Sequence, residues 1–316
     1  MHSIRSLVLT ALNQLPVIVL AVVEAALIYA ATMVAKVAFS QLSPLPAAWW
    51  RVAFALLLLW LWRRPWRSGV RRSVLPRTVS GWLWLGLLGV SAAGMNTAFY
   101  LAIKYLNVGV AVAIEFLGPL VVAVLTGRHW REYVGIAIAV CGVVTLSWNS
   151  LVTQSASLPG GSAWIGLVAI LFSGLFWGSY IVVGRRNAVS GHPLDSFAWA
   201  LLIGFLVQSL FLAYPAIHGL ASPMRSATWL RSSWGPLALI ALMLVVSVFA
   251  SFLPYIFDQF IMRRTLPSKF SVMQAINPAV ATVIGLFFGE FPTGVDLLGI
   301  FLVICAVFVT FSSDDR

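Results

Sequence analysis

Long apolar runs recur along the whole chain, and no other feature of the sequence limits the possible folds so strongly. Each run is about 20 residues long, which is enough for an α-helix to cross a hydrocarbon core of roughly 30 Å. The composition agrees, because 61% of the 316 residues are hydrophobic and only 9% are charged, against about 25% charged in a soluble domain. The sequence therefore predicts an all-α, polytopic membrane protein.

Ten membrane-spanning helices are expected. The first apolar run begins near Leu15 and has no Ala-x-Ala-like cleavage site, so it is interpreted as a retained helix and not as a cleaved signal peptide. The connections are short except at residues 63–78, 149–162 and 215–233, so the spans form one membrane domain. The expected spans are residues 15–36, 46–62, 79–103, 106–127, 133–148, 163–184, 194–214, 234–260, 267–289 and 291–312.

The distribution of arginine and lysine predicts the orientation of the chain. Alternate connections carry most of the basic residues, above all the loop 63–78, whereas the opposite side has at most Arg225, Arg231 and Lys104. Both termini are therefore expected on the cytoplasmic side of the inner membrane of a bacterial cell. The net charge of +11 is then explained by topology and by contact with lipid headgroups. No aromatic-interleaved basic patch indicates binding to nucleic acid.

The two halves of the chain share a pattern of residues. In the fourth expected span, Glu115 lies four residues before Pro119. In the ninth, Gln274 lies four residues before Pro278. Each half then has an acidic residue three positions before a glycine, and a cysteine six positions after it: Glu132, Gly135 and Cys141 in the first half, and Asp296, Gly299 and Cys305 in the second. This order of matches predicts an internal repeat.

The repeat divides the chain into five helices plus five. Since five is an odd number, the second half enters the membrane from the opposite side, which predicts a 5+5 inverted repeat with halves at residues 1–148 and 163–316 and a periplasmic linker at 149–162. Inverted repeats are typical of secondary transporters, whose binding sites lie near the midplane between the halves. A proline inside a helix frees the carbonyl four residues before it. Pro119 and Pro278 are therefore expected to break their helices and to line a shared cavity.

Several short motifs resemble those of a known family. They are "GVAVAIEFLGPL" around Glu115, "FWGSY" at 176–180, "LPYIFDQ" at 253–259, "LPS" at 266–268, "INPA" at 276–279 and "FGEFPT" at 288–293. Over nearly the whole chain they resemble the ten-helix, EamA-type members of the drug/metabolite transporter superfamily, in particular bacterial threonine/homoserine exporters. The resemblance implies export of small amino acids across the inner membrane. The chain departs from the family pattern at Asn277, where an acid is expected before the proline, and at Asp258, where a glutamate is expected.

Ionisable side chains inside the expected spans are the first candidates for a binding site, because a charge at membrane depth costs roughly 2.5–3.5 kcal/mol. Glu115 and Glu24 are candidates to bind a substrate ammonium group or a proton. The alternative for both is a structural carboxyl group that is hydrogen-bonded between helices. Arg51 and Lys36 are candidates to bind a substrate carboxylate, and their alternative is to reach the membrane surface or to pair with an acid.

Neutral polar and aromatic side chains supply further candidates. Trp177 and Tyr180 lie three positions apart on the sixth expected span and could form an aromatic wall, or could serve in packing alone. Asp258, near the cytoplasmic end of the eighth span, is expected to pair with Arg263 or Arg264. The remaining candidates are hydrogen-bonding residues whose alternative role is to hold helices together: Asn96, Tyr100, Tyr255, Gln274 and Asn277.

Other classes of function lack their sequence signatures. No HExxH, GxSxG or paired-Asp motif lies within a span, and no Walker motif indicates ATP hydrolysis, so an enzyme is not expected. Cys141 and Cys305 lie outside any metal-binding spacing, and neither a metal nor another cofactor is expected.

The expected function is a secondary transporter, either a monomer or a homodimer, that exports small amino acids (threonine/homoserine-like) or related metabolites by alternating access. Its expected partners are the small-molecule substrate, membrane lipids and, if transport is coupled, protons. The alternatives are a different substrate, such as an aromatic amino acid or a drug, and an uncoupled facilitator or exchanger.

Overall fold

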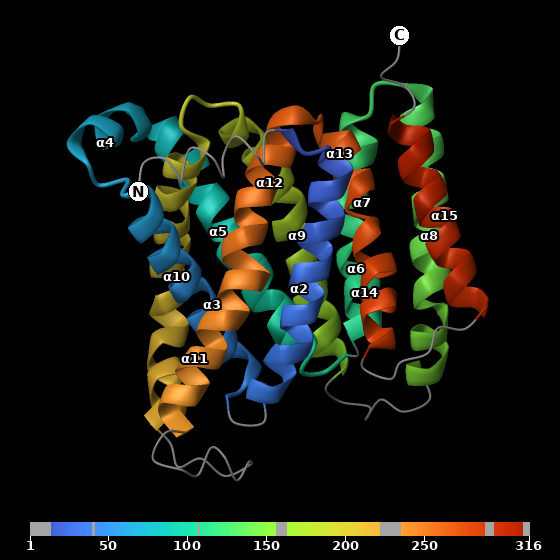
Figure 1. Cartoon of the computed structure of the whole chain (residues 1–316), viewed down its shortest axis with the longest axis horizontal. Coiled ribbons are helices and arrows are strands. Elements are labelled where there is room, and N and C mark those ends of the chain that lie inside the picture. The colour runs from blue at the N-terminus through green and yellow to red at the C-terminus, as the bar shows by residue number, and fades with distance from the viewer. Residues whose placement is uncertain are drawn as a thin grey trace.

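Helices make up all the regular structure in the described part of the chain (Figure 1). The computed structural model describes residues 14–39, 42–106, 108–155, 163–221, 235–287 and 294–311. In chain order the helices are α2 (Val17–Phe39), α3 (Pro44–Arg63), α4 (Ser68–Val74), α5 (Val79–Ala102), α6 (Val108–Glu115), α7 (Leu117–Thr126), α8 (Trp130–Ser155), α9 (Ala163–Ala188), α10 (Pro193–Ala221), α11 (Gly235–Ser247), the π-helix η2 (Val248–Phe252), α12 (Leu253–Arg264), α13 (Pro267–Met273), α14 (Ile276–Leu286) and α15 (Gly294–Phe311).

Several helical segments have the length and composition of membrane spans. Six of those described are long and apolar enough to cross a bilayer: Val17–Ala35, Pro44–Arg63, Val79–Ala102, Trp164–Ala188, Pro193–Gly219 and Gly235–Arg264. Two shorter apolar helices, Leu117–Thr126 and Leu297–Thr310, accompany them. The prediction of an all-α, polytopic membrane protein is therefore confirmed.

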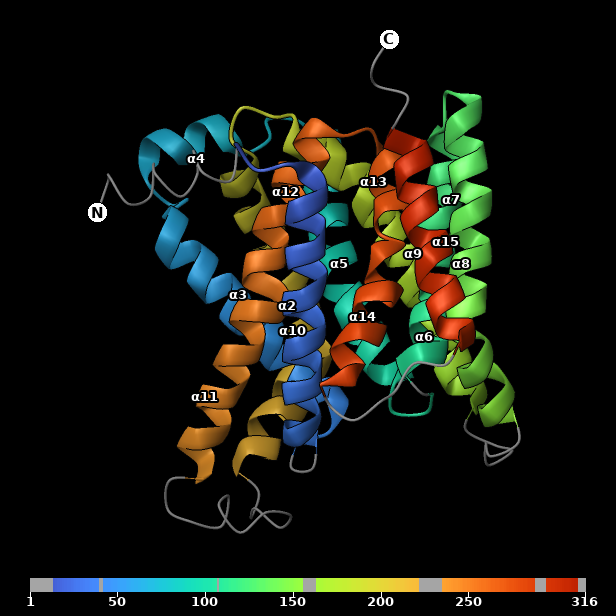
Figure 2. The same cartoon turned by 45° about the vertical axis from the view of Figure 1, so that its right-hand side comes forward.

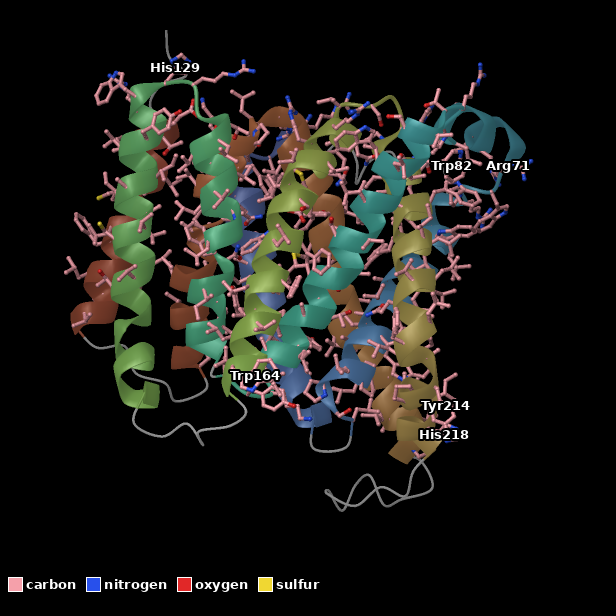
Figure 3. All side chains as sticks on the ribbon, turned by 180° about the vertical axis from the view of Figure 1, so that it is seen from behind. Arg71, Trp82, His129, Trp164, Tyr214 and His218 are labelled. Carbon is pink, nitrogen blue, oxygen red and sulfur yellow. The ribbon has the colours of Figure 1, made fainter. Side chains whose placement is uncertain are left out.

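The helices lie side by side, and the connections between them gather at two ends. α2 begins and α15 ends at the end of the bundle that carries α4 (Figure 1). α8 and α15 lie together at one edge, with α3 and α11 at the other (Figure 2). Figure 3 shows Arg71 and His129 at the α4 end, and Trp164, Tyr214 and His218 at the opposite end. The first and last described helices thus meet the same end of the bundle.

Two of the expected spans are broken near their middle. The fourth forms α6 and α7, which are separated at Phe116, and the ninth forms α13 and α14, which are separated at Gln274 and Ala275. The carbonyl of Gln274 cannot bond to Pro278, which has no N–H. It accepts a hydrogen bond of 3.0 Å from the N–H of Asn277 instead. The breaks therefore occur where the repeated prolines predict them.

A third irregularity, in the eighth expected span, was not predicted. Between α11 and α12 the chain forms one turn of π-helix, in which the N–H of Leu253 bonds to the carbonyl of Val248, five residues earlier. Pro254 follows directly and has no N–H, so the carbonyl of Ala250 is free to accept another donor. Single π-turns inside α-helices are frequently found at functional sites.

Some helices extend further than the apolar runs. α8 continues to Ser155, so the segment 149–162, expected as a linker, begins as helix. The loop 63–78 contains the short helix α4. α10 continues to Ala221 with Pro215 inside it. The apolar runs underestimate helix length because they report the depth of the hydrocarbon core, whereas a polar stretch can stay helical once its side chains reach the interface.

Glycines bring α9 into backbone contact with the broken helix α6–α7. A Cβ atom on Gly118 would lie 1.9 Å from the carbonyl oxygen of Gly174, and a Cβ atom on Gly174 would lie 2.9 Å from the carbonyl oxygen of Glu115. Only residues without a side chain permit helices to approach this closely. The contact places Ser173 beside Glu115.

Candidate functional site

A cavity of about 100 Å³ lies among α2, α3, α5, α9 and α12, beside the two helix breaks and the π-turn. Its wall collects polar side chains that are far apart in the sequence and that come from both halves of the chain. The candidates from the sequence that line it are Glu24, Arg51, Asn96, Glu115, Trp177, Tyr255, Gln274 and Asn277, and Tyr29, Thr32 and Asp258 join them.

The guanidinium group of Arg51 is held in one orientation by the irregular eighth span. Its Nε donates a hydrogen bond of 2.6 Å to Ser251 Oγ, and its Nη2 donates to the carbonyl of Ala250, which Pro254 leaves free. The ring of Tyr100 lies 5.3 Å from the guanidinium carbon, within the range of a cation–π contact. Arg51 is only 7% exposed, so it remains at the cavity and does not extend to the membrane surface.

Glu115 has a single hydroxyl partner across the helix interface. Ser173 Oγ lies 2.5 Å from Glu115 Oε1 and 2.9 Å from the carbonyl oxygen of Met95. A hydroxyl group has one proton to donate and two lone pairs that accept. Ser173 can therefore donate to an ionised Glu115, or accept a hydrogen bond from a protonated Glu115 while it donates to Met95. The site can accommodate either form of the acid.

Glu24 and Asp258 form a second acidic group in the cavity. The two carboxyl groups lie close enough to interact directly, and Asp258 Oδ2 accepts a hydrogen bond of 2.9 Å from the hydroxyl of Tyr180. In the described part of the chain, Glu24 Oε2 and Asp258 Oδ1 are buried without a hydrogen-bond partner from the protein. Buried polar atoms normally have partners. These oxygens are therefore suited to a proton shared between the two carboxyl groups, to a ligand or to water.

The expected ion pair between Asp258 and an arginine at the end of α12 is wrong. Asp258 is 6% exposed and lines the cavity, whereas Arg263 and Arg264 are exposed. The helical period explains the difference, because five or six residues rotate a side chain by about 140° or about 240° around the helix axis. Neither arginine therefore shares the face of Asp258.

The neutral candidates combine structural and lining roles. Asn96 Nδ2 donates to the hydroxyl of Tyr255 at 2.7 Å, which ties α5 to α12. Asn277 Nδ2 donates to Gln274 Oε1 at 2.9 Å, across the break between α13 and α14. Tyr180 is fully buried behind Asp258. These bonds hold the cavity wall in shape while leaving its acids and Arg51 at the surface of the cavity.

Besides Tyr180, four candidates do not line the cavity as expected or cannot be placed there. Pro119 is buried within α7 and does not line the cavity, because the break comes at Phe116, nearly one turn earlier. Tyr100 contacts Arg51 from outside the cavity wall. The side chains of Lys36 and Pro278 lie outside the described part of the structure.

Ser173 and Ser251 were missed in the sequence although they are the direct partners of Glu115 and Arg51. A serine in an apolar helix gives no sign of whether it bonds to its own backbone or to another helix. For Ser251 a partial signal exists, since Pro254 indicates a loosened turn in the same helix.

Comparison with known proteins agrees with this architecture. The EamA-like transporter family matches the chain at residues 15–148 and again at 164–312. The threonine/homoserine exporter RhtA of Escherichia coli is 30% identical over 295 residues, which cover 92% of this chain and 90% of that protein. The RhtA protein of Salmonella typhimurium is 29% identical and covers 81% of this chain and 78% of its own length.

Two further similarities extend beyond these exporters. The uncharacterized transporter YyaM of Bacillus subtilis is 27% identical over 287 residues, or 86% of each chain. A protein of known crystal structure, 18% identical, superposes with a TM-score of 0.62 over 95% of this chain and 98% of its own, and this likeness concerns the fold alone. With two family matches that together cover most of its length, the chain belongs to the EamA-like transporter family and is a transporter, not an enzyme.

Proposed function

We propose that this chain is a secondary transporter for small amino acids or closely related metabolites, and that it works by alternating access in the bacterial plasma membrane. The observation that carries the proposal is one cavity lined by a buried guanidinium group and three buried carboxyl groups. Arg51 uses Nε and Nη2 for the protein, and a guanidinium has five N–H donors. The donors that remain suit a substrate carboxylate, while the acids suit an ammonium group.

The size of the cavity favours a small substrate. At about 100 Å³ it is well below the roughly 300–1,000 Å³ of pockets that enclose drug-sized ligands. The names of the E. coli and Salmonella relatives support threonine or homoserine. The alternative, a different metabolite, is favoured by Asn277 and Asp258, which stand where the family pattern leads one to expect other residues.

The proposed architecture is ten transmembrane helices in a 5+5 inverted repeat, with both termini in the cytoplasm. Three observations support it. The family matches twice, the breaks at Phe116 and Gln274 fall at corresponding places in the two halves, and α2 begins at the end of the bundle where α15 finishes (Figure 1). Rocking of the halves around the cavity would then expose it to one side of the membrane at a time.

We further propose that Glu115 carries a proton during transport. Ser173 can switch between donating to this carboxyl and accepting from it, so both protonation states can be hydrogen-bonded without a change of partner. Export coupled to proton entry would use this exchange. An uncoupled exchanger would leave Glu115 permanently in one state.

The test is Glu115→Gln in proteoliposomes, with threonine and homoserine as substrates and a tryptophan arm for aromatic amino acids. Glutamine resembles the protonated acid but cannot release a proton. We expect the variant to lose accumulation driven by a pH gradient and to retain exchange of labelled for unlabelled substrate. Loss of both activities would indicate an ammonium-binding role instead.

The matched control is Glu132→Gln, which removes a buried carboxyl group of α8 that does not line the cavity. It should transport as the unmodified protein does. Wild-type behaviour of Glu115→Gln in both modes would reject a role for this acid. A lack of flux for every amino acid in the unmodified protein would reject the proposed substrate class.

A further inference from the structure

A second polar pocket, of about 170 Å³, lies at the end of the bundle that carries α4, away from the transport cavity. α3 and α12 end beside it and α10 begins there. Its wall includes Arg63, His192, Gln259 and Arg263. Because the apolar spans end at Arg63 and Arg264, the pocket lies at the depth of the lipid headgroups.

Gln259, which lines this pocket, has an unused hydrogen-bond donor. Asn187 Nδ2 donates to the carbonyl of Pro193, which can only accept, so the orientation of the Asn187 amide is determined. The same Nδ2 donates to Gln259 Oε1 at 2.8 Å, which determines the orientation of the second amide in turn. Gln259 Nε2 is then left buried without a partner, in a side chain that is 1% exposed.

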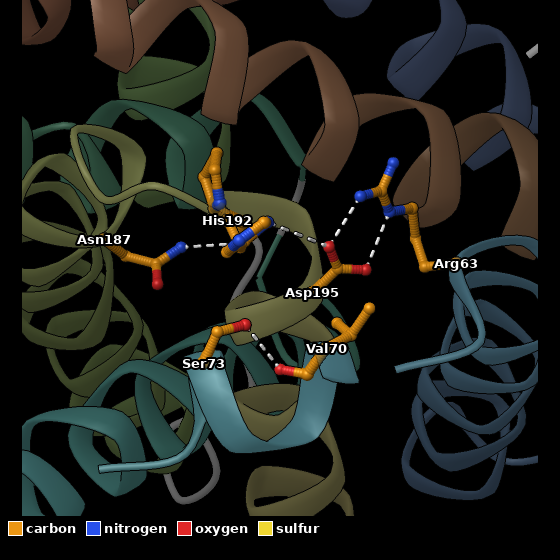
Figure 4. A network of polar contacts seen from close by, with 7 residues as sticks. Arg63, Val70, Ser73, Asn187, His192 and Asp195 are labelled. Carbon is orange, nitrogen blue, oxygen red and sulfur yellow. Dashed lines mark hydrogen bonds and ion pairs between the residues drawn. The ribbon is translucent and has the colours of Figure 1, made fainter. Parts of the chain in front are cut away.

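The charges around the pocket leave a positive excess. Arg63 forms a two-pronged ion pair with Asp195, with Nε to Oδ1 at 2.9 Å and Nη2 to Oδ2 at 2.6 Å (Figure 4). His192 Nδ1 lies 3.9 Å from the same carboxylate. Asp195 therefore balances Arg63, and the charge of Arg263 is not balanced by any acid that lines the pocket.

The remaining donors are suited to an anion with several acceptor oxygens. Of the five N–H groups of Arg63, two are used by Asp195, and the amide of Gln259 adds a neutral donor. Arginine and amide donors that converge on one pocket are typical of binding sites for phosphate groups. Arg185, whose Nη1 donates to the carbonyl of Arg263 at 2.6 Å, adds a further positive charge beside the pocket, which also favours an anion.

We propose that this pocket binds an anionic phosphate group at the membrane surface. Such a group can come from two sources, the phosphodiester of an anionic lipid headgroup or a free phosphate in solution. A bound group would contact residues of α3, α12 and the turn before α10, and so would join the first half of the chain to the second at this end.

The experiment uses the full chain, purified in detergent and depleted of lipid. Phosphatidylglycerol is titrated in one arm and inorganic phosphate in the other, both against chloride at matched ionic strength. Bound lipid is counted by native mass spectrometry, and the melting temperature is followed in both arms. Saturable binding in the first arm identifies the lipid, and a saturable thermal shift in the second identifies free phosphate.

Two variants test the residues. Gln259→Met removes the buried donor at similar length, and Arg263→Gln removes an exposed charge that the fold does not need. Each should weaken binding about tenfold, as expected for loss of a hydrogen bond to a charged group. Arg67→Gln, the same change at an exposed position outside the pocket, should leave binding unchanged.

The proposal is overturned if neither probe binds saturably, or if both pocket variants bind as tightly as the unmodified protein. It is also overturned if Arg67→Gln weakens binding as much as Arg263→Gln, because the effect would then be general surface charge. None of these outcomes depends on transport, so they are independent of the proposed function.

Discussion

Adding one methyl group at Gly118 should separate the broken helix α6–α7 from α9. The new Cβ atom of Gly118→Ala would lie 1.9 Å from the carbonyl oxygen of Gly174, whereas ordinary contact begins at 3.4 Å. The obstacle is backbone, which cannot rotate away, so the two helices must move apart by about 1.5 Å and lose much of their dispersion contact. Overpacking of this kind costs about 1–3 kcal/mol, and we expect the upper end of that range.

The same movement should disrupt the proposed transport site. The hydrogen bond between Ser173 and Glu115 crosses this interface at 2.5 Å, and a shift of about 1.5 Å would extend it beyond bonding distance. We expect Gly118→Ala to melt at a lower temperature, as measured by tryptophan fluorescence in detergent, and to lose most substrate flux in proteoliposomes.

Gly86→Ala is the matched control for this experiment. It adds the same methyl group to α5, where the nearest atom outside the helix, on Ile203, is 4.0 Å away. Alanine is favoured over glycine in a helix by about 0.5–1 kcal/mol, so this variant should be at least as stable as the unmodified protein. The reasoning is refuted if Gly118→Ala and Gly86→Ala melt and transport alike.

Three further substitutions have defined outcomes. Arg51→Lys keeps the positive charge but loses the planar guanidinium group that donates to the Ala250 carbonyl. It should lower the free energy of unfolding by about 1–3 kcal/mol and raise the KM for flux. An unchanged KM would count against contact between Arg51 and the substrate. Tyr180→Phe removes the hydroxyl donor to Asp258. The melting temperature should therefore fall by an amount that corresponds to about 1–3 kcal/mol of unfolding free energy. Equal stability would show that water replaces the hydroxyl. Asp195→Asn breaks the ion pair at the end of α3 and should lower stability in chemical unfolding by about 1.5–3 kcal/mol with no change in the rate of flux. Slower flux would connect this end of the bundle to transport.

Much of the membrane architecture follows from local features of the sequence. The apolar runs indicate where helices cross, because hydrocarbon offers no partner for polar groups. Pro119 and Pro278 indicate the two breaks, because proline removes a backbone donor wherever it stands. The polar and ionisable residues within the expected spans also predicted several residues of the cavity wall, because an ionisable group within a membrane span needs a partner or a cavity.

The hydrogen-bond partners of the cavity residues could not be predicted from local features of the sequence. Ser173 and Ser251 resemble serine and threonine residues that bond to their own helix, as Thr32 does to the carbonyl of Ile28 at 2.8 Å. Asp258 stands near arginines in the sequence and yet faces the cavity, because its position around the helix decides its neighbours. Contacts of this kind join residues many positions apart, such as Arg51 and Ser251.

By itself, then, the sequence determined the class of protein, the course of its helices and the places where they break, because each of these depends on hydrophobicity or backbone chemistry over short stretches. Only the tertiary structure decided that Arg51, Glu24, Glu115 and Asp258 share one cavity, and that Gln259 presents an unused donor in another. The physical reason is that hydrogen-bond partners depend on how helices pack against each other, and this packing depends on close contacts such as that between Gly118 and α9.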